Sequence, residues 1–294
     1  MTTTSAAPPV PLPVGRAGRP RARRAAALSF KYLALVFFVA LVLTPLYVLL
    51  VASFKGTAEA DPSTAWALPN VWTFDAWGDA WDQLRPNLKN SLYLVIPATL
   101  ISTVLGSMNG FVLSRWRFPG ADVVFLFLLF GMFIPYQAVM IPLAQLFADV
   151  DFPTGIPRLA FAHIVYGIPI TTLIFRSYYA TIPEDLIEAA RMDRAGMLRT
   201  YWSVVLPLSA PAFVVTAIWQ FTSIWNDFLF AVFLVTNPAS WPVTVALNNT
   251  TGSLVTPYNL QMSAALLASL PTLIVYILLG RYFIRGLMAG SLKG

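Results

Sequence analysis

The amino-acid sequence predicts an all-α membrane protein with six transmembrane helices and both termini in the cytoplasm. Three observations lead to this prediction. Hydrophobic residues make up 57% of the 294-residue chain, charged residues make up only 11%, and the mean hydropathy is +0.69. A typical soluble domain contains about 25% charged residues. The chain also contains six long apolar runs, and its lysines and arginines are unevenly distributed among the loops between them.

The apolar runs each reach the length of about 20 residues that is needed to cross about 30 Å of hydrocarbon. The predicted spans cover residues 30–53, 90–113, 121–147, 158–180, 205–235 and 261–284. Prolines interrupt most of them, at Pro45, Pro97, Pro135, Pro142, Pro169 and Pro271. Kinked helices are tolerated inside a bundle because neighbouring groups satisfy the freed carbonyls. The spans therefore predict a bundle of partly kinked helices.

The region before the first span is rich in proline, alanine and arginine and lacks apolar periodicity. Residues 1–27 are therefore predicted to form a disordered basic tail, and residues 28–294 to form the membrane domain. A cleaved signal peptide is the alternative. The first apolar run is long for a signal peptide, and no clear small-residue cleavage site follows it.

The positive charges predict the orientation. Of the 19 lysines and arginines, 15 lie in the tail, in the loops after spans two and four, and at the C-terminal end. The other four are Lys55, Arg85, Lys89 and Arg158. Because cytoplasmic loops retain positive charge, both termini are expected in the cytoplasm of a multi-pass protein of the cytoplasmic membrane. The net charge of +6 thus indicates topology more than nucleic-acid binding.

The first outer loop is rich in tryptophan. Trp77, Ala80, Trp81 and Leu84 share one helical face, which predicts a helix lying on the outer leaflet, where tryptophan is favoured. Stacking of these rings on a sugar is the alternative interpretation.

Small residues recur at intervals of four in the second span, at Ser102, Gly106 and Gly110. Such a stripe allows a second helix to approach closely. We interpret it as a packing feature without chemistry of its own.

Several kinds of catalytic site are excluded by composition. The chain has no cysteine, so it has no disulfide, thiol nucleophile or thiolate metal site. His163 is its single histidine, and neither an HExxH motif nor a phosphate-loop lysine motif is present. We therefore expect no enzyme activity, no metal site and no bound cofactor in this chain, and we interpret His163 as a packing group.

A charged segment, residues 181–207, separates the fourth and fifth spans. Thr181 and Glu184 have the spacing of a capping box, which predicts a short helix over about 182–193. After Gly196, a second helical stretch places Leu198, Tyr201, Trp202 and Val205 on one face. The segment is too polar to insert into the membrane and too structured for a linker. A solvated loop of any transporter is the alternative.

The residue pattern of this segment resembles the EAA signature of permease subunits of ATP-binding-cassette (ABC) importers. The matching residues are Glu188-Ala189-Ala190, Asp193, a glycine and the later VVLPL. Further similarity lies in NSL at 90–92, SRWRFPG at 114–120, WNDF at 225–228 and RYFIRGLMAGSLKG at 281–294. The combination resembles the sugar-uptake branch, specifically the shorter permease of maltose-type systems. IPYQAVMIPL and PVTVALNN resemble the glucose/mannose-type importers.

The resemblance implies the type I importer fold and a set of partners. These are a second permease subunit, two cytoplasmic ATPase subunits that use ATP and Mg²⁺, an extracytoplasmic solute-binding protein and a sugar. The segment would dock in a cleft of an ATPase. The implied coupling residues are Glu188, Ala189, Ala190, Asp193, Gly196 and Leu198. Glu188 would pair with a basic group there, and the C-terminal AGSLKG would reach toward the ATPases.

One position departs from the family pattern. The signature usually has glycine where this chain has Arg194, and a glycine appears two places later, at Gly196. A left-handed arginine costs about 1 kcal/mol. We therefore expect the turn to shift toward Gly196.

Polar residues within the spans are candidates for a solute path. Thr216, Gln220, Ser223 and Asp227 follow one another at spacings of four, three and four, with Asn226 beside them. Tyr136 and Gln137 follow Pro135 in the third span. Polar groups within a span usually face the bundle or an aqueous path. A path role, a position at the outer membrane interface and contacts between helices all remain open for these residues.

Two other functions are compatible with parts of the sequence. A self-sufficient, ion-coupled secondary transporter usually buries paired ionisable groups near the midplane, and this chain shows no clear midplane carboxylate. An ABC permease for a non-sugar solute differs in the flanking motifs. The sugar is left open, because selectivity lies largely in the binding protein and the sister permease.

Overall fold

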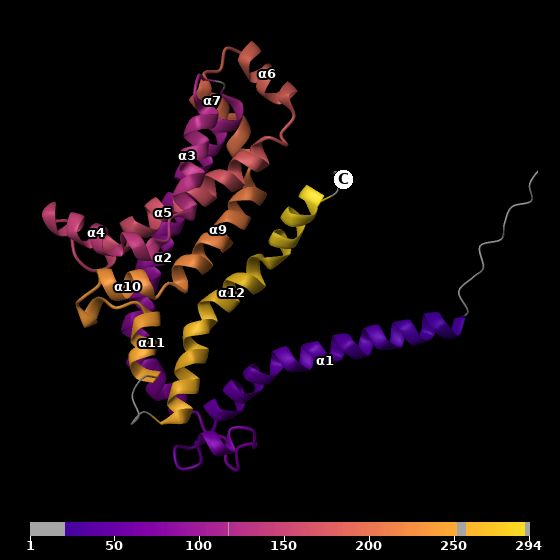
Figure 1. Ribbon diagram of the computed structural model, residues 1–294, viewed down its shortest axis with the longest axis vertical. Coiled ribbons are helices and arrows are strands. Elements are labelled where there is room, and N and C mark those ends of the chain that lie inside the picture. The colour runs from indigo at the N-terminus through magenta and orange to yellow at the C-terminus, as the bar shows by residue number, and fades with distance from the viewer. Residues whose placement is uncertain (1–20, 117, 252–256, 292–294) are drawn as a thin grey trace, which may run out of the picture. The chain divides into compact units, whose positions relative to one another are not determined.

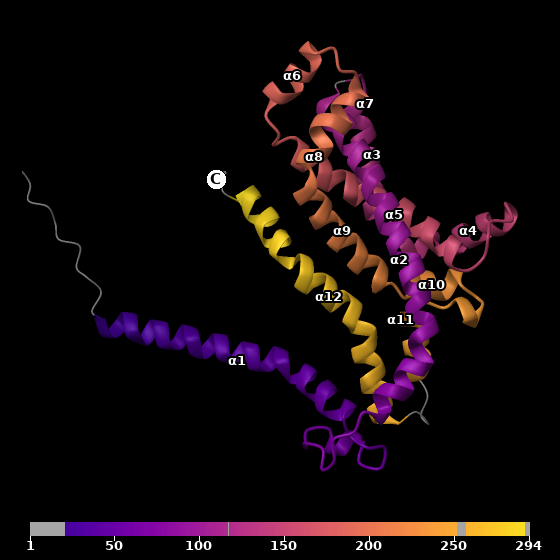
Figure 2. The ribbon, with the colours of Figure 1, turned by 180° about the vertical axis from the view of Figure 1, so that it is seen from behind.

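The computed structural model describes residues 21–116, 118–251 and 257–291, and every regular element among them is helical. The chain divides into two units, Met1–Val48 and Leu49–Gly294, which are described separately. The four longest helices are α1 Arg21–Ser53, α2 Asp75–Arg115, α5 Ile156–Tyr179 and α12 Tyr258–Ser291. Figures 1 and 2 show these helices from opposite sides.

The shorter elements lie between these helices in the chain. They are the helices α3 Ala121–Phe133, α4 Tyr136–Asp149, α6 Glu184–Met192, α7 Met197–Thr200, α8 Leu206–Leu208, α9 Ala210–Trp225, α10 Leu229–Leu234 and α11 Val243–Thr251. A π-helical turn, η2, covers Tyr201–Val205, and single 3₁₀ turns cover Pro62–Thr64 and Pro238–Ser240.

The first unit consists of most of α1. Its apolar side chains are exposed around the whole helix, as in Phe37, Phe38 and Val42, which is the pattern of a helix whose surroundings are themselves apolar. Because α1 begins at Arg21, the last seven residues of the predicted disordered tail are helical, which corrects that prediction. Residues 1–20 of the tail, like residues 292–294 of the C-terminal AGSLKG, lie outside the described residues.

The centre of the second unit is the pair α2 and α5, which lie side by side in both views (Figures 1 and 2). A Cβ atom added at Gly106 would lie 2.1 Å from Thr171 Oγ1, and one at Gly110 would lie 2.7 Å from the Cβ of Phe175. The Thr171 hydroxyl also donates to the Ser102 carbonyl at 3.0 Å. The predicted small-residue stripe is therefore confirmed as the surface on which a second helix packs.

Among the described residues, four helices are long and apolar enough to cross a membrane, and the number reaches six if two bent pairs each count as one span. The first pair, α3 and α4, is bent by 98°. Pro135 causes this bend, because the residue before a proline is pushed out of helical conformation, and Ile134 is extended with ψ 116°. The second pair, Met197–Leu208 and α9, is bent by 79°.

The fifth predicted span is wrong in its continuity. A single helix over 205–235 was expected, but α9 ends at Trp225 and α10 is a separate helix that begins at Leu229. The turn that joins them, residues 226–228, contains Asn226 and Asp227, but it is too short to lower the mean hydropathy of the whole stretch.

The predicted helix on the outer leaflet is instead the beginning of α2. Ala80 and Leu84 are fully buried in the main core, so this face packs against protein. Trp77 is half-buried and stacks on Phe54 with ring centroids 5.6 Å apart, whereas Trp81 is 47% exposed. Polar groups within the loop before α2 form hydrogen bonds with one another. Within it, buried Lys55 donates to the Thr64 carbonyl at 2.5 Å.

Candidate functional site

The charged segment begins with α6, which lies at one end of the second unit, next to the end of α2 (Figure 1). The helix is slightly shorter than predicted, and the expected capping box is absent. The hydroxyl of Thr181 donates to the Tyr178 carbonyl at 2.7 Å rather than accepting from α6. Glu184 and Asp185 occupy the first turn, where the helix dipole favours carboxylates.

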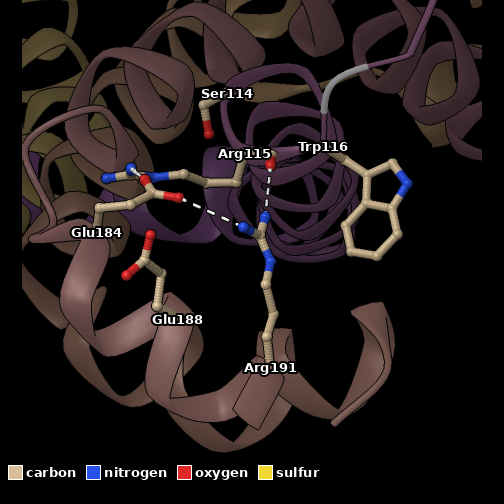
Figure 3. Close-up of a pocket in the computed structure, with 6 residues that line it drawn as sticks. All are labelled: Ser114, Arg115, Trp116, Glu184, Glu188 and Arg191. Carbon is tan, nitrogen blue, oxygen red and sulfur yellow. Dashed lines mark hydrogen bonds and ion pairs between the residues drawn. The ribbon is translucent and has the colours of Figure 1, made fainter. Parts of the chain in front are cut away.

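Arg115, at the end of α2, attaches α6 to the membrane helices (Figure 3). Its guanidinium donates to the carbonyl of Tyr179, the last residue of α5, and to that of Ile182, three residues later. It also forms an ion pair with Glu184 at 2.6 Å. Glu184 is also 3.6 Å from the guanidinium of Arg191. The Arg115 side chain is only 10% exposed. It therefore satisfies carbonyls that a helix end otherwise leaves to solvent.

A pocket of about 800 Å³ opens between the end of α2 and α6 (Figure 3). It is lined by Ser114, Arg115, Trp116, Glu184, Glu188 and Arg191. The Glu188 carboxylate forms no hydrogen bond or ion pair with any residue that the structure describes. Because Arg115 and Arg191 both engage Glu184, the carboxylate of Glu188 remains available to a cation from outside the chain.

The two sides of α6 differ. Ile187 and Ala190 are buried, and Ile187 packs in a cluster with residues of α2, α5 and η2. Glu188 and Ala189 are exposed, so the two alanines of the EAA motif do not share one environment. Met192 is 83% exposed next to them, and Leu198 on α7 is 58% exposed. The side of this segment that faces away from the protein is thus partly apolar and contains carboxylates that are unpaired within the described part of the chain, of which Glu188 also lines the pocket.

The turn after α6 places its left-handed residue at Arg194, with φ +55°, whereas Gly196 is extended with φ −68° and ψ 169°. The expected shift of the turn to Gly196 is therefore wrong. The Ala195 amide donates to the Ala190 carbonyl and the Arg194 amide to the Arg191 carbonyl, both at 2.9 Å. This is the bonding of a Schellman motif, whose left-handed position usually holds glycine. Asp193 is the C-cap residue.

A buried group of hydroxyls links this segment to the helices behind it. Ser107 on α2 is 2.6 Å from the Tyr179 hydroxyl and 2.8 Å from the Tyr201 hydroxyl. The Ser209 hydroxyl also donates to Tyr179, at 3.2 Å. In the π-helical turn η2, Tyr201 and Val205 are buried whereas Trp202 is 56% exposed. The four residues predicted to share one face therefore divide into an exposed pair, Leu198 and Trp202, and a buried pair, Tyr201 and Val205.

The polar residues of the predicted solute path fall into two groups. Gln220 is buried, and its side-chain amide donates to the His163 carbonyl at 3.4 Å. Asp227 Oδ2 lies 3.4 Å from His163 Nε2, in a geometry too poorly aligned for a hydrogen bond, and it accepts from the Ala231 amide at 3.2 Å. Buried Thr216 lies on the same helix as Gln220. These contacts connect α5 with α9 and α10 within the chain.

The other candidate path residues are more accessible. Ser223, Asn226 and Gln137 are exposed, and the Asn226 side chain donates back to the Thr222 carbonyl at 2.8 Å. Tyr136 is half-buried against Phe230, with ring centroids 5.1 Å apart. Within the part of the chain that the structure describes, no group of three or more His, Asp or Glu side chains could hold a metal ion.

The sequence did not reveal the role of Arg115 or the cluster of buried hydroxyls formed by Ser107, Tyr179 and Tyr201. Arg115 counted there only as a cytoplasmic charge and as part of the SRWRFPG motif. A basic residue in the last turn of a helix is a recognised signal for carbonyl contacts. Its actual partners lie 64 to 69 positions away in the chain, so local spacing does not reveal them.

Comparison with known proteins gives a family match. Residues 98–288 match the family described as binding-protein-dependent transport system inner membrane component. The glucose import system permease protein GlcU of Saccharolobus solfataricus is 34% identical over 275 residues, which cover 90% of this chain and 96% of that protein. The probable ABC transporter permease protein PH1216 of Pyrococcus horikoshii is 49% identical over 165 residues. That match spans 56% of this chain and 60% of the other protein.

A solved structure is similar in fold. One chain in the crystal structure of a bacterial ABC transporter that imports the acidic polysaccharide alginate superimposes with a TM-score of 0.76. The superposition covers 90% of this chain and 99% of that chain, at 23% sequence identity. The fold of this chain is thus similar to that of a chain in a solved ABC transporter.

Proposed function

The chain belongs to the family of inner-membrane components of binding-protein-dependent transport systems, and we propose that it is one of two permease subunits of an ATP-driven sugar importer. Family membership confirms the resemblance found in the motifs and disfavours the self-sufficient, ion-coupled transporter. A permease for a non-sugar solute is the remaining alternative. The relative that imports glucose supports a sugar, since it aligns with 90% of this chain.

The coupling role of residues 181–207 is supported by the free carboxylate of Glu188. It lies at an open pocket beside exposed Ala189 and Met192, a combination that suits a basic group in an apolar-lined cleft of another protein. Asp193 and Gly196 would shape the turn, and Leu198 would extend the contact surface. Two ATPase subunits that use ATP and Mg²⁺ would supply the energy, while this chain itself binds no cofactor.

The internal contacts of the site provide a route for movement from α6 into the membrane helices. Arg115 attaches α6 to α2 and to the end of α5, and the hydroxyl of Tyr201 attaches the following turn to Ser107 of α2. A displacement imposed on this segment by an ATPase would therefore act on both central helices. The uneven distribution of lysine and arginine supports placing α6 and both termini in the cytoplasm.

The solute path would form between this subunit and its sister permease. Exposed Ser223, Asn226 and Gln137 offer neutral hydroxyl and amide groups, and Tyr136 offers an aromatic face. These groups suit the hydroxyls of a sugar that an extracytoplasmic binding protein delivers. Gln220 and Asp227 would act on the path through the packing of α5 against α9 and α10.

The substitution Glu188→Lys tests the coupling role. We expect the variant to insert into the membrane normally but to associate with its ATPase subunits about 100-fold more weakly, because a reversed charge in a desolvated contact leaves the partner charge unpaired. The measurement is the amount of ATPase that co-purifies with the subunit, together with ATP-driven uptake of a panel of sugars, amino acids and peptides in proteoliposomes.

The matched control is Asp79→Lys, which makes the same charge change at an exposed residue near the other end of α2 and should retain the ATPases. If Glu188→Lys keeps normal ATPase retention and uptake, the coupling role of Glu188 is wrong. If the wild type transports only amino acids or peptides, the sugar assignment is wrong while the coupling role stands.

A further inference from the structure

We propose that a groove formed by α2, α9 and α12 binds an anionic phospholipid, with its headgroup on Arg85 and Lys89 and an acyl chain in the groove. The site lies toward the end of α2 that is remote from α6. The proposal goes beyond the transport function proposed above and does not depend on ATP coupling, since it concerns only the surface that the chain presents to the membrane.

The groove is a small and almost entirely apolar space of about 260 Å³. Its lining residues are Trp81, Arg85, Leu88, Lys89, Leu92, Trp225, Leu267, Leu270 and Pro271. Trp225 is buried, and its indole N–H already donates to the Ala268 carbonyl at 3.0 Å. The groove therefore offers hydrocarbon contacts and almost no hydrogen-bonding groups, which suits an acyl chain and does not suit a sugar.

Two unpaired cations lie at the edge of this groove. Arg85 and Lys89 are one helical turn apart, both are exposed, and neither forms an ion pair with a residue that the structure describes. Like charges at this spacing destabilise a helix unless an anion lies between them. The two other basic residues of the predicted outer loops are engaged, because Lys55 and Arg158 each donate to a backbone carbonyl.

The position along α2 fits the headgroup layer of a membrane. Lys89 and Arg85 precede Arg115 by about 39 and 45 Å, at 1.5 Å per residue. A bilayer is about 30 Å thick in its hydrocarbon core and about 40–45 Å with its headgroups. When the Arg115 end of α2 lies at one surface, the two cations lie among the headgroups of the other leaflet. Trp81, 47% exposed one turn further, is a residue type favoured at that interface.

The cationic edge of the groove thus matches the headgroup of an anionic phospholipid, and its apolar lining matches an acyl chain of the same molecule. A phosphate ester would lie between the guanidinium and the ammonium group, and an acyl chain would extend past Leu267 and Leu270. Free phosphate would use the cations but not the apolar lining. A helix of another subunit would use the apolar lining but would leave the cations unpaired unless it supplied a carboxylate.

The experiment measures lipid retained by the subunit when it is purified, with the proteins that accompany it, from membranes containing equal amounts of phosphatidylglycerol and phosphatidylcholine. Native mass spectrometry counts the bound lipids. The wild type should retain one phosphatidylglycerol per copy of the chain. The double variant Arg85→Gln, Lys89→Gln should bind it about 25-fold more weakly, at about five-fold per cationic group near an anionic lipid surface.

Two further variants separate the headgroup contact from the groove. Leu270→Trp leaves both charges in place and fills the groove, so it should also lose the lipid. The double variant Arg85→Lys, Lys89→Arg keeps both charges and should retain it. The proposal is overturned if phosphatidylglycerol retention is unchanged in the glutamine variant or in Leu270→Trp. It is equally overturned if phosphatidylcholine is retained as well as phosphatidylglycerol, or if a photo-crosslinker at position 92 captures a protein chain in place of lipid.

Discussion

Replacing Arg115 with methionine tests how α6 is attached to the membrane helices. The substitution removes a buried guanidinium but keeps most of the apolar side chain. Each hydrogen bond from a charged donor to a carbonyl contributes about 1.5 kcal/mol at the low end of the measured range. The two bonds to Tyr179 and Ile182 then contribute about 3 kcal/mol. The ion pair with Glu184 adds little, because that carboxylate is half-exposed.

The expected consequence is local opening of the segment that follows α5. A loss of about 3 kcal/mol corresponds to amide hydrogen exchange about 150-fold faster over residues 180–196, if exchange proceeds through this opening. Hydrogen-exchange mass spectrometry of the purified protein measures this directly. ATPase retention should fall in parallel, since α6 would no longer be held against α2.

The control is Arg176→Met, which removes another arginine near the same end of the bundle. Arg176 pairs with exposed Asp122 at 3.2 Å, donates to the Leu113 carbonyl at 3.4 Å and lies over the Phe125 ring. None of these contacts involves residues 180–196, so exchange over that segment should be unchanged in this variant. Unchanged exchange in Arg115→Met would refute the reasoning. The same acceleration in both variants would show that the effect is general destabilisation and not loss of a specific attachment.

Three further predictions concern the turn at Arg194, the cluster of hydroxyls around Ser107, and the contact of Asp227 with the first turn of α10. Arg194→Gly should slow exchange over the end of α6 about five-fold, because a left-handed non-glycine residue costs about 1 kcal/mol; faster exchange would contradict this. Tyr201→Phe should cost about 1 kcal/mol in thermal stability, and its effect should be non-additive with Ser107→Ala if the two hydroxyls are bonded. Asp227→Ala should cost about 1 kcal/mol by removing an acceptor from the first turn of α10, whereas Asp227→Asn should cost less; equal losses in both would place the effect in the contact with His163.

Hydropathy alone located the membrane helices because apolar length is a property of a short stretch of chain. The bend between α3 and α4 was also open to prediction, since Pro135 acts on its immediate neighbour. The end of α9 at Trp225 was not, because the turn that follows is only three residues long and lies between two apolar stretches, so hydropathy averaged over a span does not detect it. There, side-chain contacts from α5 and α10 decide the backbone direction, and these contacts depend on residues distant in the chain.

In the candidate site too, local sequence predicts some features, and contacts between distant residues determine the others. The spacing of Thr181 and Glu184 indicated a short helix, which is present although the capping box is not, and the position of the following turn was misjudged from glycine preference. A preference of about 1 kcal/mol is smaller than the stabilisation gained by burying Ile187 and Ala190. That burial fixes where α6 ends and therefore makes Arg194 the left-handed residue. The contacts of Arg115 with Tyr179 and Glu184 involve residues too distant in sequence for any periodicity to detect.

The close contact of α2 and α5 at Gly106 and Gly110 has a mechanical consequence. No room exists there for even a methyl group, so the ridge of one helix is locked against the other, and the pair cannot slide lengthwise without separating. We therefore expect a displacement of α6 to tilt α2 and α5 together as one rigid body. The flexing that this tilt requires would then fall on the sharp corners at Pro135 and Ser209, where the backbone already leaves its helical path.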